Sequence, residues 1–257
     1  MRRFLCIART EVLEHKRQPW MIFILAANYA IFIVVFGALF LGIDNLASRP
    51  EGLLQLRQQM AGFGVALETF LQLATSTFGS LCFTNLPLYV AIMSGTSVLH
   101  DRECGTMPFL MLAPLTRGQL LAGKLVGAMT IPLVLHLLFV GTSSLLLGRL
   151  ESLTPYAHKL GASPAWWLAF LVGAPASAGF VGALGTVISA LSRDVRTAMQ
   201  YTSFFIGLLS LGIGFVLVDG IARGAALQVG FAAGCVVATA LTLLIGARLI
   251  SKDLMSS

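Results

Sequence analysis

The sequence contains little charge. Only 11% of its 257 residues are Asp, Glu, Lys or Arg, whereas a soluble domain carries about 25%. These charges are too few to cover the surface of a water-soluble fold of this length, and 57% of the residues are hydrophobic. The bilayer is therefore the expected solvent. Because no polar stretch is long enough for a separate soluble domain, we expect a single transmembrane domain over residues 1–257.

Patterns that would indicate a metal site, an enzyme or a nucleic-acid-binding protein are also missing. The four cysteines have no CxxC-like spacing, so we expect neither disulfides nor zinc. No HExxH occurs, and Ser94-Gly95 lacks the GxSG context of a nucleophile. The net charge is +6, but the basic residues lie in short segments between apolar runs and form no nucleic-acid-binding motif. We predict no catalytic site, no metal, no cofactor in this chain and no nucleic-acid partner.

What the sequence does contain is six long stretches without charged residues. Each exceeds the roughly 20 residues that cross the hydrocarbon of a bilayer. Lipid cannot hydrogen-bond the backbone, so these stretches must be helices. The predicted fold is an all-α polytopic membrane protein with six transmembrane helices. The stretches are 18–43, 69–100, 125–148, 160–192, 197–218 and 224–247.

The Lys and Arg residues indicate the orientation of the chain. Twelve of them fall on one side of the membrane and five on the other, and the richer side is normally cytoplasmic. We therefore predict a multi-pass protein of the bacterial inner membrane with both termini in the cytoplasm. The basic segment 1–19 has Phe4, Leu5, Ala8 and Val12 at helical spacing, which predicts an amphipathic helix on the cytoplasmic face. Apolar residues at helical spacing over 53–63 predict a short external helix.

The most informative loop is the segment 101–116, between the second and third stretches. Thr106 is a suitable N-cap residue, and Pro114 ends the short helix that follows. Thr116 and Gln119 then form a capping box that begins the third span. The short helix carries Phe109, Leu110 and Leu112, which have no core of their own to enter. Such a helix indicates docking into another protein.

This segment resembles the coupling region of type-2 ABC transporter permeases. That family has an acid-x-acid-x-Gly-Thr stretch, a Leu-rich short helix, Pro-x-x-Arg, and Gly-Lys at the next span. Pro108 departs from the usual aliphatic residue of the family. The six-span layout and the amphipathic N-terminal helix are similar too. The matching residues are Asp101, Glu103, Gly105, Thr106, Leu110, Pro114, Arg117, Gly123 and Lys124.

The resemblance implies a function and a set of partners. In this family two permease subunits form the export pathway as a homo- or heterodimer. Two separate ATPase subunits bind ATP and Mg and receive the coupling helices. The resemblance, with the apolar residues of the short helix, assigns ATPase coupling to a set of residues of this chain. They are Asp101, Glu103, Gly105, Thr106, Phe109, Leu110 and Arg117.

One near-match to a nucleotide-binding motif lies in the same region. Gly118, Gly123 and Lys124 have the spacing of a P-loop, but Leu125 occupies the position that needs Ser or Thr. The segment also follows a helix cap where a P-loop needs a strand. We therefore expect this chain alone to bind no ATP.

Four polar residues inside the spans are candidates for the transport pathway. His136 is the one ionisable residue deep within a span, which makes it a functional hypothesis, although a neutral His bonded to a neighbouring helix explains it as well. Asn28 and Asn85 are either pathway residues or hydrogen-bonding links between helices. Thr84 shares one face with Thr77 and Ser80, and that face lines either a pathway or a helix contact.

Small residues recur every four positions in the last three spans, notably Gly182, Gly214 and the pair Gly230 and Gly234, and such ridges allow close helix contact. Two other functional classes stay open at this point. An intramembrane enzyme would need more base chemistry than His136, and a secondary carrier would need an acid beside a broken helix. The cargo is equally open, among lipids, peptides, drugs, ions and a metal-enzyme maturation factor.

Overall fold

The computed structural model describes residues 2–16, 19–49, 51–112, 114–147 and 164–249, and this part of the chain contains helices and no strand. Two spans contain a π-helical stretch, η2 and η3, which joins the α-helices on either side. The elements are α1 (Arg2–Lys16), α2 (Pro19–Ala47), α3 (Gly52–Gly62), α4 (Leu67–Glu103), α5 (Met107–Leu112), α6 (Arg117–Leu147), α8 (Pro164–Leu168), η2 (Ala169–Gly173), α9 (Ala174–Leu191), α10 (Val195–Tyr201), η3 (Thr202–Ile206), α11 (Gly207–Arg223) and α12 (Ala225–Leu249).

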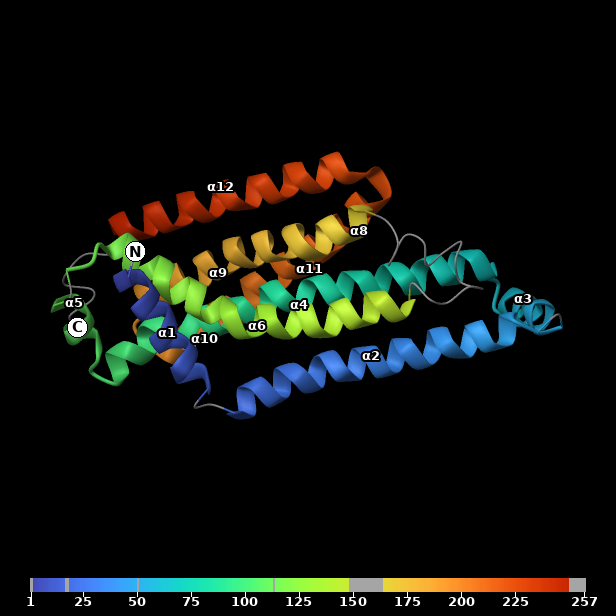
Figure 1. Ribbon diagram of the computed structural model, residues 1–257, viewed down its shortest axis with the longest axis horizontal. Coiled ribbons are helices and arrows are strands. Elements are labelled where there is room, and N and C mark those ends of the chain that lie inside the picture. The colour runs from blue at the N-terminus through green and yellow to red at the C-terminus, as the bar shows by residue number, and fades with distance from the viewer. Residues whose placement is uncertain (1, 17–18, 50, 113, 148–163, 250–257) are drawn as a thin grey trace.

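The long helices run side by side as one elongated bundle (Figure 1). In the part of the chain that the structure describes, six helical segments are long and apolar enough to cross a membrane, which confirms the predicted all-α fold with six spans. Helices α1 and α5 lie at one end of the bundle, called the α5 end below, and α3 lies at the other, the α3 end (Figure 1). The short helix expected over 53–63 is present as α3.

Helices α4 and α9 form the centre of the bundle. They pack against each other more extensively than any other pair, and α6, α11 and α12 pack around them. Most residues in the apolar part of α4 are buried, whereas most residues in the apolar parts of α2 and α12 are not. This is expected for helices whose outer faces meet lipid. The centre is filled by a continuous core of side chains that includes Phe83, Trp166 and Leu217.

The span of α6 begins at Arg117, eight residues before the charge-free stretch that predicted it. The reason is the capping box. The Thr116 backbone N–H donates to Gln119 Oε1 at 3.1 Å, and the Gln119 N–H donates to Thr116 Oγ1 at 3.2 Å. These two bonds satisfy two backbone N–H groups at the start of the helix that otherwise have no partner. Lys124 consequently lies on a helix, two turns inside its start.

Several of the small residues allow helices to approach closely. A Cβ atom at Gly182 of α9 would lie 2.6 Å from Val90 Cγ1 of α4, and one at Gly214 of α11 would lie 2.7 Å from the Ser80 carbonyl oxygen of α4. The Gly230–Gly234 pair of α12 behaves differently, because added Cβ atoms there meet nothing within 4 Å. Its face is therefore open within this subunit.

Candidate functional site

The coupling segment begins with a tight turn after α4. Gly105 has φ +68°, in the left-handed region that glycine adopts without a steric penalty. The Thr106 N–H donates to the Asp101 carbonyl at 2.9 Å, which closes the turn. The Thr106 carbonyl then accepts from the N–H groups of Phe109 and Leu110, so Thr106 starts α5. Its hydroxyl does not cap that helix as expected, since it donates to Asp101 Oδ1 at 3.1 Å.

Helix α5 combines one buried anchor with an exposed apolar surface. Met107 is 1% exposed, whereas Phe109 is 74% and Leu112 is 81% exposed. Leu110, predicted as an outward anchor, is half-buried and packs against the cluster that contains Met107. The outward apolar pair is thus Phe109 and Leu112.

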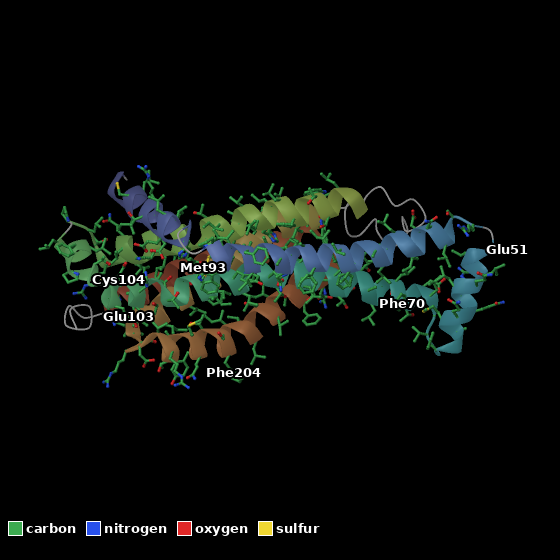
Figure 2. The ribbon with its side chains drawn as sticks, turned by 90° about the horizontal axis from the view of Figure 1, so that it is seen from below. Glu51, Phe70, Met93, Glu103, Cys104 and Phe204 are labelled. Carbon is green, nitrogen blue, oxygen red and sulfur yellow. The ribbon has the colours of Figure 1, made fainter. Side chains whose placement is uncertain are left out.

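The charged residues of the segment lie in three different environments. Glu103 is exposed at the last position of α4, and Figure 2 shows it with Cys104 at the end of the bundle opposite to Glu51. Arg117 is half-buried at the first position of α6. Asp101 is 2% exposed, so its carboxylate points into the subunit and not toward a partner. Of the predicted coupling residues, Glu103, Gly105, Thr106 and Phe109 are exposed.

A buried ion cluster lies directly behind the coupling segment. Lys124 Nζ is 2.5 Å from Glu11 Oε2 of α1 and 2.7 Å from Asp101 Oδ2 of α4. It also donates to the Ser97 carbonyl at 3.3 Å. The three ionisable side chains are 1–3% exposed. Lys124 is the lysine of the near-match to a P-loop. Its ammonium group therefore contacts two carboxylates of its own chain.

With all three groups ionised, the cluster would hold more negative than positive charge, because one ammonium group faces two carboxylates. Burial raises the pKa of Glu11 from 4.5 to about 7, and the attraction of Lys124 only partly opposes this effect. Burial also lowers the pKa of the neighbouring His15 to about 4, with a smaller contribution from Lys124. His15 is thus neutral at physiological pH, and Glu11 exchanges its proton in that range.

Helix α1 packs against α6 through a face that overlaps the expected one only in part. Ile7, Ala8, Glu11 and His15 are buried, whereas Leu5 is 54% exposed. Of the apolar residues 4, 5, 8 and 12 that the sequence pattern selected, Ala8 is buried and Val12 is half-buried, whereas Leu5 is exposed. Glu11 was missed because an acid on a basic amphipathic helix is usually solvated. The available signal was Lys124, a lone cation inside an apolar helix that needs a counter-ion.

The four polar residues of the spans come from three helices, and His136 and Asn85 are buried inside the subunit. His136 of α6 is fully buried, 3.4 Å from the Tyr29 hydroxyl of α2 through Nδ1, and its ring lies 5.0 Å from that of Phe170. Among the described residues, Asn28 Oδ1 and Asn85 Nδ2 have no hydrogen-bond partner. Thr84 faces Gly214 at the α4–α11 contact. His136 and Thr84 therefore lie at contacts between helices.

Comparison with known proteins decides the family. The sequence profile of the ABC-2 family transporter proteins matches residues 5–230. The chain belongs to this family. It is also 27% identical over 214 residues to the probable ABC transporter permease protein NosY of Pseudomonas aeruginosa, a match that covers 82% of this chain and 70% of that protein. This member of the ABC-2 family is thus a multi-pass permease, the membrane subunit of an ABC transporter.

Proposed function

We propose that this permease works as a dimer in an ATP-driven exporter, and that separate ATPase subunits bind it through α5. The observation that carries the proposal is the exposed apolar pair Phe109 and Leu112 on a helix that the subunit itself holds in place. A six-residue helix is not stable alone in water. The Gly105 turn and the buried Met107 keep it folded while its outer face stays free.

The charge distribution supports a cytoplasmic position for α5, on the side of the membrane where ATP is available. The Lys/Arg-rich side of a membrane protein is normally cytoplasmic, and Arg102, Arg117 and Lys124 border the coupling segment. Both termini and α5 then face the cytoplasm of a bacterial inner membrane. The nucleotide and Mg are bound by the partner ATPase, and this chain supplies the docking surface and the pathway.

A second permease subunit is required to form the pathway. The interior of one subunit is filled by a continuous apolar core, so a cargo-sized channel through it is closed. The outer helices α2 and α12 expose large apolar side chains such as Phe23, Val34 and Val237. A homologous or identical subunit covering part of this surface leaves a pathway along the boundary between the two. His136, Asn28, Asn85 and Thr84 contribute to it only if these helices separate.

The test compares two phenylalanines at opposite ends of the bundle. Phe109→Ala truncates the 74% exposed anchor of α5, and Phe63→Ala makes the same change at a 78% exposed residue next to α3. Removing an interface anchor costs about 1–3 kcal/mol, which weakens binding by about tenfold or more. Co-purification with the ATPase from native membranes, followed by titration of the purified subunits, measures this loss.

The proposal expects Phe109→Ala to weaken ATPase binding while Phe63→Ala leaves it unchanged. Both variants should insert into the membrane normally, because neither side chain is buried. An equal effect of the two changes, or a natural chain that holds no ATPase at any concentration, would refute coupling through α5. Crosslinking of native membranes tests the dimer, and a strictly monomeric species in active complexes would refute it.

A further inference from the structure

We propose that Glu11 and Lys124 are positioning residues that join α1 to the coupling segment, so that α1 and α5 act as one docking unit for the ATPase. The inference rests on the proposed function and extends it to the N-terminal helix. Two independent sets of contacts carry it, one ionic and one apolar, and both connect elements that are far apart in the sequence.

The ionic contacts form a continuous chain from α1 to α5. Glu11 of α1 pairs with Lys124 of α6 at 2.5 Å, and Lys124 pairs with Asp101 of α4 at 2.7 Å. Asp101 in turn accepts a hydrogen bond from the Thr106 hydroxyl at 3.1 Å, one residue before α5. Because the three ionisable side chains are almost fully buried, loss of Lys124 would leave its carboxylate partners without a counter-ion, which is strongly unfavourable.

The apolar contacts join the same elements without using charge. Ile7 of α1 and Met107 of α5 belong to one buried cluster, together with Val98, Leu120 and Leu121. A shift of α1 therefore removes packing from the cluster that holds Met107. Since Met107 is the anchor of α5, the orientation of Phe109 depends on the position of α1.

A glycine of α6 provides a way to move α1 without changing any charge. A Cβ atom at Gly127 would lie 2.7 Å from Glu11 Cγ and 2.9 Å from the Ala8 carbonyl oxygen. The Ala8 carbonyl is backbone and cannot rotate away, so Gly127→Ala must displace α1. Gly141 lies on the same helix, and a Cβ there would meet Phe170 Cζ at an ordinary 3.6 Å. Gly141→Ala is therefore the matched control.

The docking unit should respond to pH through Glu11. Lys124 of α6, Asp101 of α4 and His15 and Glu14 of α1 are the charged or titratable groups that act on it. With Glu11 protonated, Lys124 and Asp101 neutralise each other. As pH rises through the Glu11 pKa of about 7, a second buried carboxylate becomes ionised, so the folded contact is progressively destabilised. His15 is neutral throughout this range because its pKa is about 4.

The experiment measures two properties of the same full-length variants. The first is how firmly α1 packs against the bundle, called the seating of α1 below, and the second is the binding of the ATPase. Ile7→Cys, in a chain whose exposed Cys6 and Cys104 are changed to Ser, reports the seating of α1 by its rate of reaction with a soluble maleimide. Titration with the purified ATPase reports docking. Both are measured from about pH 6 to about pH 8, on either side of the Glu11 pKa of about 7.

We expect Gly127→Ala to speed the labelling and to weaken ATPase binding by about tenfold, comparable to loss of an interface anchor, while Gly141→Ala changes neither. In the otherwise natural chain, the labelling rate relative to that of the same cysteine in the unfolded chain at each pH, which removes the rise in thiolate fraction, should become several-fold faster and docking weaker as pH rises across this range. Glu11→Gln keeps the shape of the protonated acid, so it should abolish that pH dependence.

Two results would overturn the inference. In one, Gly127→Ala speeds labelling but leaves ATPase affinity unchanged, which would separate α1 from docking. In the other, the Glu11→Gln chain and the natural chain have the same pH profile. If instead the natural chain binds no ATPase at all, the proposed function fails, and the docking role of α1 fails with it. The maleimide rates would still show whether the ion cluster holds α1 against the bundle.

Discussion

The contact between α11 and α4 gives a prediction about two glycines of α11, Gly214 and Gly212, which differ in how closely they approach α4. A Cβ atom at Gly214 would overlap Thr84 Oγ1 and lie 2.7 Å from the Ser80 carbonyl oxygen. The Thr84 side chain can rotate, but the Ser80 carbonyl cannot, so Gly214→Ala must push α11 away from α4. At Gly212, two residues earlier on the same helix, an added Cβ meets nothing within 4 Å.

The expected effects have opposite signs. Replacing Gly by Ala inside a helix stabilises it by about 0.5–1 kcal/mol, and overpacking a close contact costs about 1–3 kcal/mol. Gly212→Ala should therefore be neutral or stabilising, whereas Gly214→Ala should destabilise the fold. The two variants should differ by about 1–3 kcal/mol, the overpacking cost alone.

Equilibrium unfolding of the purified variants in mixed micelles, followed by the loss of helical circular dichroism, measures this difference. Adding Thr84→Ala to Gly214→Ala should restore only part of the stability, because the Ser80 carbonyl still blocks the Cβ. The packing argument is refuted if Gly214→Ala is as stable as Gly212→Ala. If Gly214→Ala is fully stable but alters transport, the Thr84 face lines the pathway instead.

Three further predictions concern the α5 end, the buried acid and the topology. Met107→Ala should destabilise the fold by about 2–4 kcal/mol, since Met107 is 1% exposed, whereas Phe109→Ala should change the unfolding free energy by less than about 0.5 kcal/mol. The Glu11→Gln change removes the titration of Glu11 and leaves that of His15. In this chain His15 takes up a proton near pH 6.5 when the chain is unfolded but only near pH 4 when it is folded. The free energy of unfolding should therefore rise by about 1.4 kcal/mol per pH unit between pH 4 and pH 6.5, measured by unfolding at several pH values. A membrane-impermeant maleimide should label Ser48→Cys, at the end of α2 next to α3, from outside intact cells, but not the exposed Cys104; labelling of Cys104 alone would reverse the topology.

The elements of the fold could be predicted from composition because lipid leaves the chain few choices. A charge-free stretch of more than about 20 residues has to be a helix in a membrane, and all six such stretches correspond to helices that can span it. Local rules also located the start of α6, since the Thr116–Gln119 capping box involves only residues three apart. The resemblance of segment 101–116 to the coupling region led to the correct family.

The arrangement of the site could not be predicted, because it depends on contacts between distant segments. Glu11 and Lys124 are 113 positions apart, and no periodicity links an acid on one helix to a cation on another. The same limit explains Leu110, which faces the Met107 cluster although the helix pattern alone left all its apolar residues outward. For His136 the sequence left two explanations open, and the partner that bears on them, Tyr29, lies on α2.

The close fit of α4 and α9 has a mechanical consequence. A Cβ atom at Gly185 of α9 would lie 2.8 Å from the Ala91 carbonyl oxygen of α4, and one at Gly182 would lie 2.6 Å from Val90 Cγ1. Sliding one helix along the other would bring side chains into these narrow gaps, so the pair translates and tilts as a rigid body. Helix α4 has 37 residues and is about 55 Å long. It joins α3 at one end to the coupling segment at the other. Pro87 removes one backbone hydrogen bond near its middle, so a displacement at the α5 end would reach the α3 end through a helix that can bend at this residue.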